Sequence, residues 1–264
     1  MSLSDFILEC HNNLVKGGNR EVVVAQEYLT KRNILGRCIN AHNIGYCSNS
    51  TTLPDFIRFL GQENTEEDKK WDMSYFIRGR LVVPIYSEFG KAVGFATRVP
   101  STLPGNTWWN VPFKKSSHIF LLNVAREEAY KQNKIYLVEG YMDALTLYQE
   151  GIKNVGCIMG TALASRKIGL IARYCNNVCL CFDTDKNEAG QNAQKMAISI
   201  LKKFDFCEKI SVIDNLPVGE DPNVFVIKHG IGEFLSKERA LKAVEIKRIC
   251  KEIATKGKEY ANAQ

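Results

Sequence analysis

Two short apolar runs that end in carboxylates constrain this chain more than any other feature of its sequence. Ile135–Val138 is followed by Glu139, and Val178–Phe182 is followed by Asp183 and Asp185. Apolar runs of this length are typical of strands buried in a parallel sheet, whose last residues lie at the carboxyl edge of that sheet. Because ligands bind at this edge in open α/β sheets, we expect the three carboxylates to lie together there.

Carboxylates that lie together repel one another unless cations separate them. Mg²⁺ and Mn²⁺ prefer oxygen ligands and are therefore the expected cofactors. Asp183 and Asp185 are two residues apart on an extended segment, so both side chains can point the same way and hold one ion. Glu139 ends a different strand, where it can bridge a metal or act on a nucleophile. Two simpler interpretations stay open, because a strand-end Asp can cap the next helix and Glu139-Gly140 can be a turn.

From residue 134 onward, segments typical of strands alternate with segments typical of helices. Strands are expected at 135–139, 155–159, 178–182 and 210–213, and helices at 142–150, 163–174 and 189–203. This order predicts an α/β fold with helices flanking a mainly parallel sheet. Upstream we expect a helix followed by a Gly-containing turn over 19–36, with Asn19 as N-cap and Val24, Tyr28 and Leu35 on the apolar face. A short strand at 43–47, a hairpin of strands at 81–86 and 92–99, and a helix over 120–131 are expected to follow.

These segments predict three parts: a mixed α+β basic subdomain over 1–131, a catalytic α/β subdomain over 132–215, and a helical closing segment over 216–264. The formal net charge is +6, which is compatible with a polyanionic partner. Between Arg78 and His118, six Lys and Arg residues stand against the single acid Glu88. Such runs are more often solvated faces than binding sites, but the position just upstream of the carboxylate strands favours a binding role.

Nine cysteines are scattered through the chain, and none forms a Cys-x-x-Cys pair. Cys38, His42 and Cys47 lack a fourth ligand and paired spacing, so no zinc site is expected. Free thiols in this number indicate a reducing compartment. No apolar stretch reaches the length of a membrane span and the first residues do not form a signal peptide, so we expect a cytoplasmic protein.

The strand-end Glu139 followed by Asp183-x-Asp185 resembles the Toprim domain. The longer run Glu139-Gly140-Tyr141-Met142-Asp143 is similar to the DnaG-type primases of bacteria and phages, which make RNA primers on single-stranded DNA. The resemblance extends over roughly residues 20–235. It is carried, in order, by Tyr28-Leu29, Ile44-Gly45-Tyr46, Arg80–Ile85, Gly94-Phe95, Gly160-Thr161, Ala189-Gly190 and Gly219-Glu220-Asp221-Pro222.

The resemblance implies a Toprim-type fold and two-metal nucleotidyl transfer from NTPs. It implies that Glu139, Asp183 and Asp185 are the catalytic residues and metal ligands, with Asp221 as a further ligand. Asp143 would either support the site as a neighbour of these groups or cap the helix expected to begin at Met142. The residues implied to contact the single-stranded template are Arg80, Arg98, Trp108, Asn110 and Lys115.

The chain departs from the family in several places, one of which is two extra residues between Asp185 and the Ala189-Gly190 pair. Thr107-Trp108 replaces the usual Lys-Tyr, which removes one cation, although Trp108 can still stack on a base. Asn223 replaces an Asp and weakens an outer metal position. The zinc ribbon that usually precedes the core and the helicase-binding bundle that usually follows it are not in this sequence, which is then a core with separate partners, a cut-down or phage-type version, or an excised fragment. A separate zinc-binding module and a replicative helicase are the expected partners. Alternative functions are a Toprim nuclease and a non-enzymatic DNA-binding recombination mediator, whereas a topoisomerase would need a further cleavage module.

Overall fold

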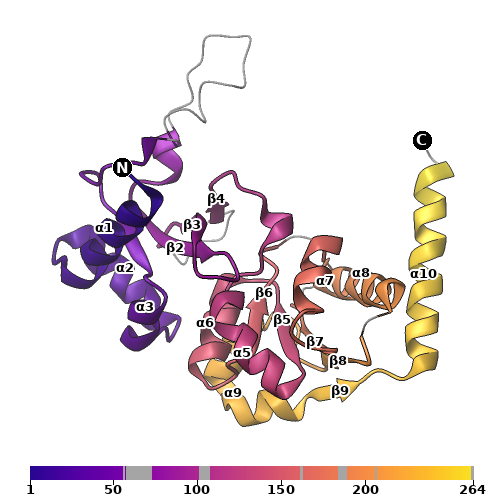
Figure 1. The fold of residues 1–264 in the computed structure, drawn as a ribbon. Coiled ribbons are helices and arrows are strands. Elements are labelled where there is room, and N and C mark those ends of the chain that lie inside the picture. Colours follow the sequence, from indigo (N-terminus) through magenta and orange to yellow (C-terminus); the bar gives the residue numbers. More distant parts are fainter. Residues whose placement is uncertain are drawn as a thin grey trace. The chain divides into compact units, whose positions relative to one another are not determined.

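A computed structural model describes residues 1–55, 57, 73–100, 108–160, 163–183, 189–205 and 207–262. Asp185, Thr161 and Thr107 lie outside these ranges. The chain forms two compact units, Met1–Phe113 and Lys114–Gln264 (Figure 1). This division differs from the boundary expected at residue 131, and the second unit also contains the segment expected to be separate from residue 216. The three functional subdomains remain a prediction.

The first unit contains a small antiparallel sheet with helices packed on it. Its strands β1 (Gly45–Cys47), β2 (Arg80–Tyr86), β3 (Ala92–Arg98) and β4 (Trp108–Asn110) follow one another in chain order across the sheet. Its helices are α1 (Leu3–Lys16), α2 (Arg20–Lys31) and α3 (Gly36–Ala41), with a 3₁₀ turn at Met73–Phe76. The apolar face of α1, which includes Phe6 and Cys10, packs into one core with Phe95 of β3. The hairpin expected from the sequence is therefore the centre of this unit.

Helix α2 confirms its predicted cap but only part of its predicted face. The side chain of Asn19 accepts a hydrogen bond from the Val22 amide, as an N-cap does. The buried residues are Val22, Ala25, Tyr28 and Leu29, whereas Val24 is 43% exposed. The helix ends at Lys31, so Leu35 lies beyond it at the start of α3. The predicted apolar face is therefore confirmed at Tyr28 and wrong at Val24 and Leu35, because three neighbouring valines are compatible with more than one helical stripe.

The second unit confirms the predicted α/β fold. Its sheet has the strand order β6-β5-β7-β8-β9. The strands are β5 (Ile135–Val138), β6 (Val155–Cys157), β7 (Asn177–Cys181), β8 (Lys209–Ile213) and β9 (Glu238–Ala240), and all neighbouring pairs are parallel except β8 with β9. The antiparallel edge strand β9 lies in a segment expected to be wholly helical, so that expectation was wrong there.

Helices cover both faces of this sheet. On one face, α5 (Leu122–Gln132), α7 (Ser165–Ile171) and α8 (Ala189–Phe204) share a core with β5, β7 and β8. Right-handed crossovers place α6 (Tyr141–Gln149) and α7 on opposite faces, because the chain moves to opposite sides of β5 after each helix. Helix α6 packs against α9 (Pro222–Ser236), and α10 (Ala243–Asn262) packs against α8.

No helix within the described residues is long and apolar enough to cross a membrane.

Candidate functional site

The topology of the second sheet marks one place for a ligand. From β5 the chain goes to β6 on one side, and β7 then lies on the other side of β5. In such sheets the crevice between the carboxyl ends of these two strands is the usual binding site. Val138 pairs with Cys181 at those ends, so Glu139 lies one residue beyond β5 and Asp183 two residues beyond β7. Neighbouring strands are about 4.8 Å apart, which brings the backbones of Glu139 and Asp183 close together.

Burial suits these two side chains to hold a cation. One carboxylate oxygen of each, Oε1 of Glu139 and Oδ1 of Asp183, is shielded from solvent. Carboxylate oxygens are the ligands that hard divalent cations prefer, and a buried carboxylate gains most from one. Within the described ranges, no three His, Cys, Asp or Glu side chains form a metal-binding group. The predicted three-carboxylate cluster depends on Asp185, which is not described, and therefore remains a prediction.

Gly190 fixes how helix α8 meets Asp183. A side chain at this position would collide with the backbone carbonyl of Asp183. Glycine therefore allows the first turn of α8 to lie directly against the end of β7. This contact gives a physical reason for the glycine of the Ala189-Gly190 pair, which the chain shares with the family that it resembles.

Asp143 and Asp221 both serve the beginning of helix α9. Asp221 is its N-cap, and its Oδ1 accepts a hydrogen bond of 2.7 Å from the Val224 amide. Asp143, which is buried, accepts a 3.0 Å bond from the Asn223 amide. Helix α6 begins at Tyr141 with Gly140 as its N-cap, and Asp143 lies in its first turn. Asp143 joins α6 to α9, and its expected capping of α6 and the metal role of Asp221 both remain predictions.

The predicted template residues divide between the two units. In the first, the Arg98 guanidinium lies over the rings of Tyr28 and Trp108, 5.0 and 5.1 Å from their centroids. Trp108 therefore already stacks on a cation within its own unit. Arg80 begins β2, where burial lowers its pKa from the ordinary value. Asn110 ends β4, an element that the sequence did not predict.

Lys115 belongs to the second unit, in a 3₁₀ turn at Lys115–Ser117 that packs against α7. That turn is tied to α7 by a 3.2 Å hydrogen bond from Arg166 to Ser117. Arg78, at the start of the basic stretch in the sequence, belongs to the first unit. Its guanidinium donates to the backbone carbonyls of Ser48, Asn49 and Thr51 and so holds the loop after β1. Part of the basic excess in the sequence is therefore structural.

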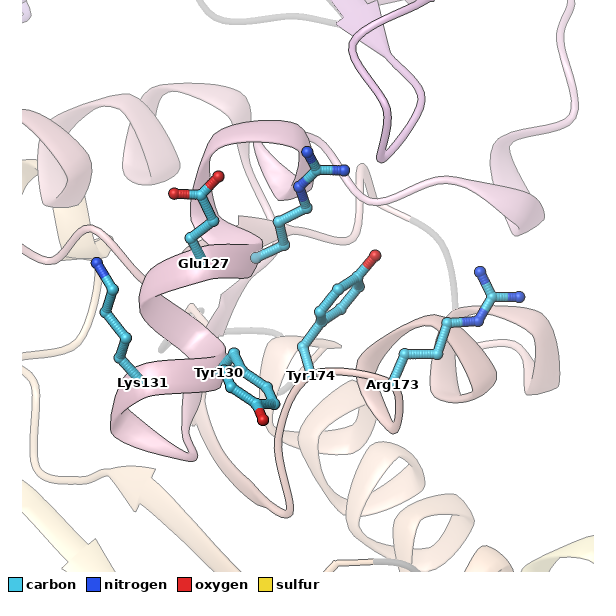
Figure 2. A pocket seen from close by; sticks show the side chains of 6 residues that line it. Glu127, Tyr130, Lys131, Arg173 and Tyr174 are labelled. Atoms are coloured by element: carbon cyan, nitrogen blue, oxygen red, sulfur yellow. The ribbon is translucent and has the colours of Figure 1, made fainter.

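Among the hollows lined by described residues of the second unit, one includes a predicted site residue. A cavity of about 310 Å³ between α8, β9 and α10 has Asp183 in its wall, together with Gln191 and Arg248. A hollow of about 480 Å³ lies between α5 and the end of α7 (Figure 2). Figure 2 shows Tyr130 and Tyr174 in its centre, surrounded by charged side chains. None of the predicted site residues lines this second hollow, so the candidate site is at Glu139 and Asp183.

Sequence reasoning missed Lys167, whose side chain is fully buried on α7. The available signal was a lysine directly before Ile168, within a helix whose other core residue is Ile171. It also assigned no role to Cys157, which lies at the end of β6 beside the candidate site.

Both halves of the chain match families of known function. Residues 11–126 match the DNA primase catalytic core, N-terminal domain, and residues 136–226 match the Toprim-like domain. The chain belongs to the DnaG-type primases. The family resemblance drawn from Glu139–Asp143 is therefore confirmed.

DNA primases of Rickettsia typhi and Clostridium acetobutylicum are 30% and 31% identical to this chain over 221 and 223 residues. Each alignment covers 80% of this chain, but the chain spans only 37% and 36% of these curated primases. Among solved structures, a DNA primase domain from Pseudomonas aeruginosa is 26% identical with a TM-score of 0.75, covering 90% of this chain and 78% of that one. The Aquifex aeolicus primase, solved with its zinc binding and RNA polymerase domains, is 27% identical with a TM-score of 0.69, covering 91% and 63%.

Proposed function

We propose that this chain is the catalytic core of a DNA primase, a nucleotidyltransferase that synthesises short RNA primers on a single-stranded DNA template during replication. The observation that carries the proposal is the placement of Glu139 and Asp183 at the carboxyl ends of adjacent strands, at the topological switch point of the sheet. The match to both parts of a primase core, in the right order along the chain, supports it.

In the proposed reaction, the 3′-hydroxyl oxygen of the growing primer bonds to the α-phosphorus of an NTP. The bond to pyrophosphate breaks, and the hydroxyl proton passes to a base. Glu139, Asp183 and Asp185 would hold Mg²⁺ or Mn²⁺, with Asp221 as an outer ligand. When bound, these ions neutralise charge on the attacking oxygen and on the leaving pyrophosphate. The buried oxygens of Glu139 and Asp183 are suited to this because they face little competition from water.

The template would contact the basic residues Arg80, Arg98 and Lys115, with Trp108 and Asn110 near the bases. We further propose a cytoplasmic location, for which the nine free cysteines are the support. A separate zinc-binding module and a replicative helicase are the proposed partners. The zinc binding domain named in the Aquifex aeolicus primase supports the first of these.

The test is incubation with single-stranded DNA, labelled NTPs and Mg²⁺ or Mn²⁺. Short RNA products support the proposal, shortened DNA would instead identify a nuclease, and DNA binding without either product would identify a binding module. Glu139→Gln and Asp183→Asn should each abolish most synthesis, a loss on the order of several kcal/mol of transition-state stabilisation. Glu208→Gln is the matched control, because this exposed carboxylate precedes β8 at the opposite edge of the same sheet. Equal activity of all three variants would contradict the proposal.

A further inference from the structure

The turn after β6 is bonded to the end of β5, where Glu139 lies. The Ile158 amide donates to the carbonyl of Val138 at 2.9 Å, and the Gly160 amide donates to the carbonyl of Glu139 at 3.1 Å. Met159 and Gly160 both have left-handed backbone conformations, with φ of 61° and 64°. That conformation is costly for a methionine, so the rest of the structure must hold this turn in place.

A buried thiol makes a second bond to the same carbonyl. Cys157 Sγ lies 3.0 Å from the Glu139 carbonyl, to which it donates, and 3.1 Å from the Met159 amide, from which it accepts. Its side chain is fully buried, so solvent does not compete for either hydrogen bond. The two bonds tie the end of β6 to the backbone of Glu139.

A buried ammonium group holds the other side of the turn. Lys167 Nζ, which reaches from α7, donates to the Ile158 carbonyl at 2.6 Å. The side chain is 0% exposed, and its neighbours on α7, Ile168 and Ile171, belong to the apolar core. Burial of a charged group costs free energy unless the group is hydrogen-bonded, so packing alone does not explain a lysine here. Its hydrogen bond to Ile158 holds the turn after β6, and that turn is hydrogen-bonded to Glu139.

We propose that Lys167 and Cys157 are positioning residues for nucleotidyl transfer, and that together they hold the turn 157–160 so that the backbone of Glu139 is fixed at the site. Neither side chain touches substrate. This inference rests on the proposed function, because it assigns Glu139 a part in the reaction. It predicts that loss of either hydrogen bond impairs catalysis although no predicted metal ligand is changed.

The test compares primer synthesis by four variants. Lys167→Met keeps the length of the side chain but removes the donor, and Cys157→Ala removes the thiol, whereas Cys157→Ser retains a donor. Lys153→Met is the matched control, because Lys153 also donates to a backbone carbonyl, that of Tyr148 at 2.7 Å, but is exposed and lies just before β6, at the amino edge of the sheet. Lys167→Met and Cys157→Ala should lower kcat about 10- to 100-fold, with KM for NTPs changed less than threefold. Cys157→Ser should recover most of the loss, and Lys153→Met should have the wild-type kcat.

Thermal unfolding of each variant separates this role from simple loss of structure, since the expected kcat losses occur in folded protein. If Lys167→Met does not fold, the difference between Cys157→Ala and Cys157→Ser still decides the question. Wild-type kcat in folded Cys157→Ala, with Glu139→Gln inactive, would overturn the positioning role and leave the proposed function intact. Full activity of Glu139→Gln would overturn the proposed function itself.

Discussion

The buried Lys167 should make the stability of the protein depend on pH in the alkaline range. Burial lowers the pKa of Lys167 from 10.5 to about 8, and the nearby charge of Lys115 contributes in the same direction. In the unfolded chain the amine would titrate near its ordinary value. Between pH 8 and 10.5 the unfolded state therefore binds more protons than the folded state, and the free energy of unfolding must rise with pH over this window.

The size of this effect follows from the two pKa values. Proton linkage gives a gain of about 2 to 3 kcal/mol in the free energy of unfolding between pH 7 and pH 10. Groups distant from Lys167 contribute equally to wild type and to Lys167→Met. They cancel in the difference between the two proteins, which leaves the lysine and its coupling to Cys157.

The assay is urea unfolding of both proteins at pH 7, 8, 9 and 10, followed by far-ultraviolet circular dichroism. Tryptophan fluorescence is unsuitable because all three tryptophans precede residue 113, in the other unit. Wild type should gain stability relative to Lys167→Met as the pH rises. A difference that stays constant within about 0.5 kcal/mol would refute the reasoning, since it would mean that the amine titrates alike in both states.

Three further predictions concern other contacts. Burial by itself would raise the pKa of Glu238, but hydrogen bonds from Lys134, Ser211 and Tyr136 hold that pKa below 4.5. The free energy of unfolding should therefore fall as the pH drops below that value. Urea unfolding at pH 3–6 should show a smaller loss for Glu238→Gln than for wild type, and equal losses in the two proteins would contradict this. Gly190→Ala should displace α8 from Asp183 and lower primer synthesis. Gly169 on α7 has open space around it, so Gly169→Ala should instead stabilise that helix by up to about 1 kcal/mol in thermal unfolding. Similar effects of the two substitutions would count against the Gly190 contact. Lys115→Ala should reduce the slope of log affinity for single-stranded DNA against log salt by roughly 0.7, and an unchanged slope would place the template elsewhere.

The sequence was sufficient to predict the central strands of the second sheet. Strand β5, and β7 after its first residue Asn177, are apolar runs, and their burial on both faces leaves them little alternative structure. The same runs predicted correctly that Glu139 and Asp183 lie at one edge, because parallel strands present their carboxyl ends together. Helix α1 was missed although its signal was present, with Ser2 as N-cap and Phe6, Cys10 and Leu14 at helical spacing.

Other features depend on contacts between residues far apart in sequence. Strand β9 has only three residues, two of them charged, and pairs at the sheet edge. Its Glu238 is held by Lys134, more than one hundred residues earlier, with distances of 2.7 and 2.6 Å to its two oxygens. Lys167 likewise has a meaning only once α7 is folded over the turn after β6. No local pattern in the sequence contains that information, so these parts required the structure.

The central claim is that a catalytic metal lies at the carboxyl ends of β5 and β7. The most direct test replaces Mg²⁺ with Fe²⁺ in the presence of ascorbate and peroxide, so that hydroxyl radicals cut the backbone close to the bound ion. Mass spectrometry should find cuts immediately after β5 and β7, near Glu139 and Asp183, which excess Mg²⁺ suppresses and Glu139→Gln weakens. Cuts confined to other parts of the chain, or cuts at these positions that neither Mg²⁺ nor Glu139→Gln diminishes, would contradict the claim.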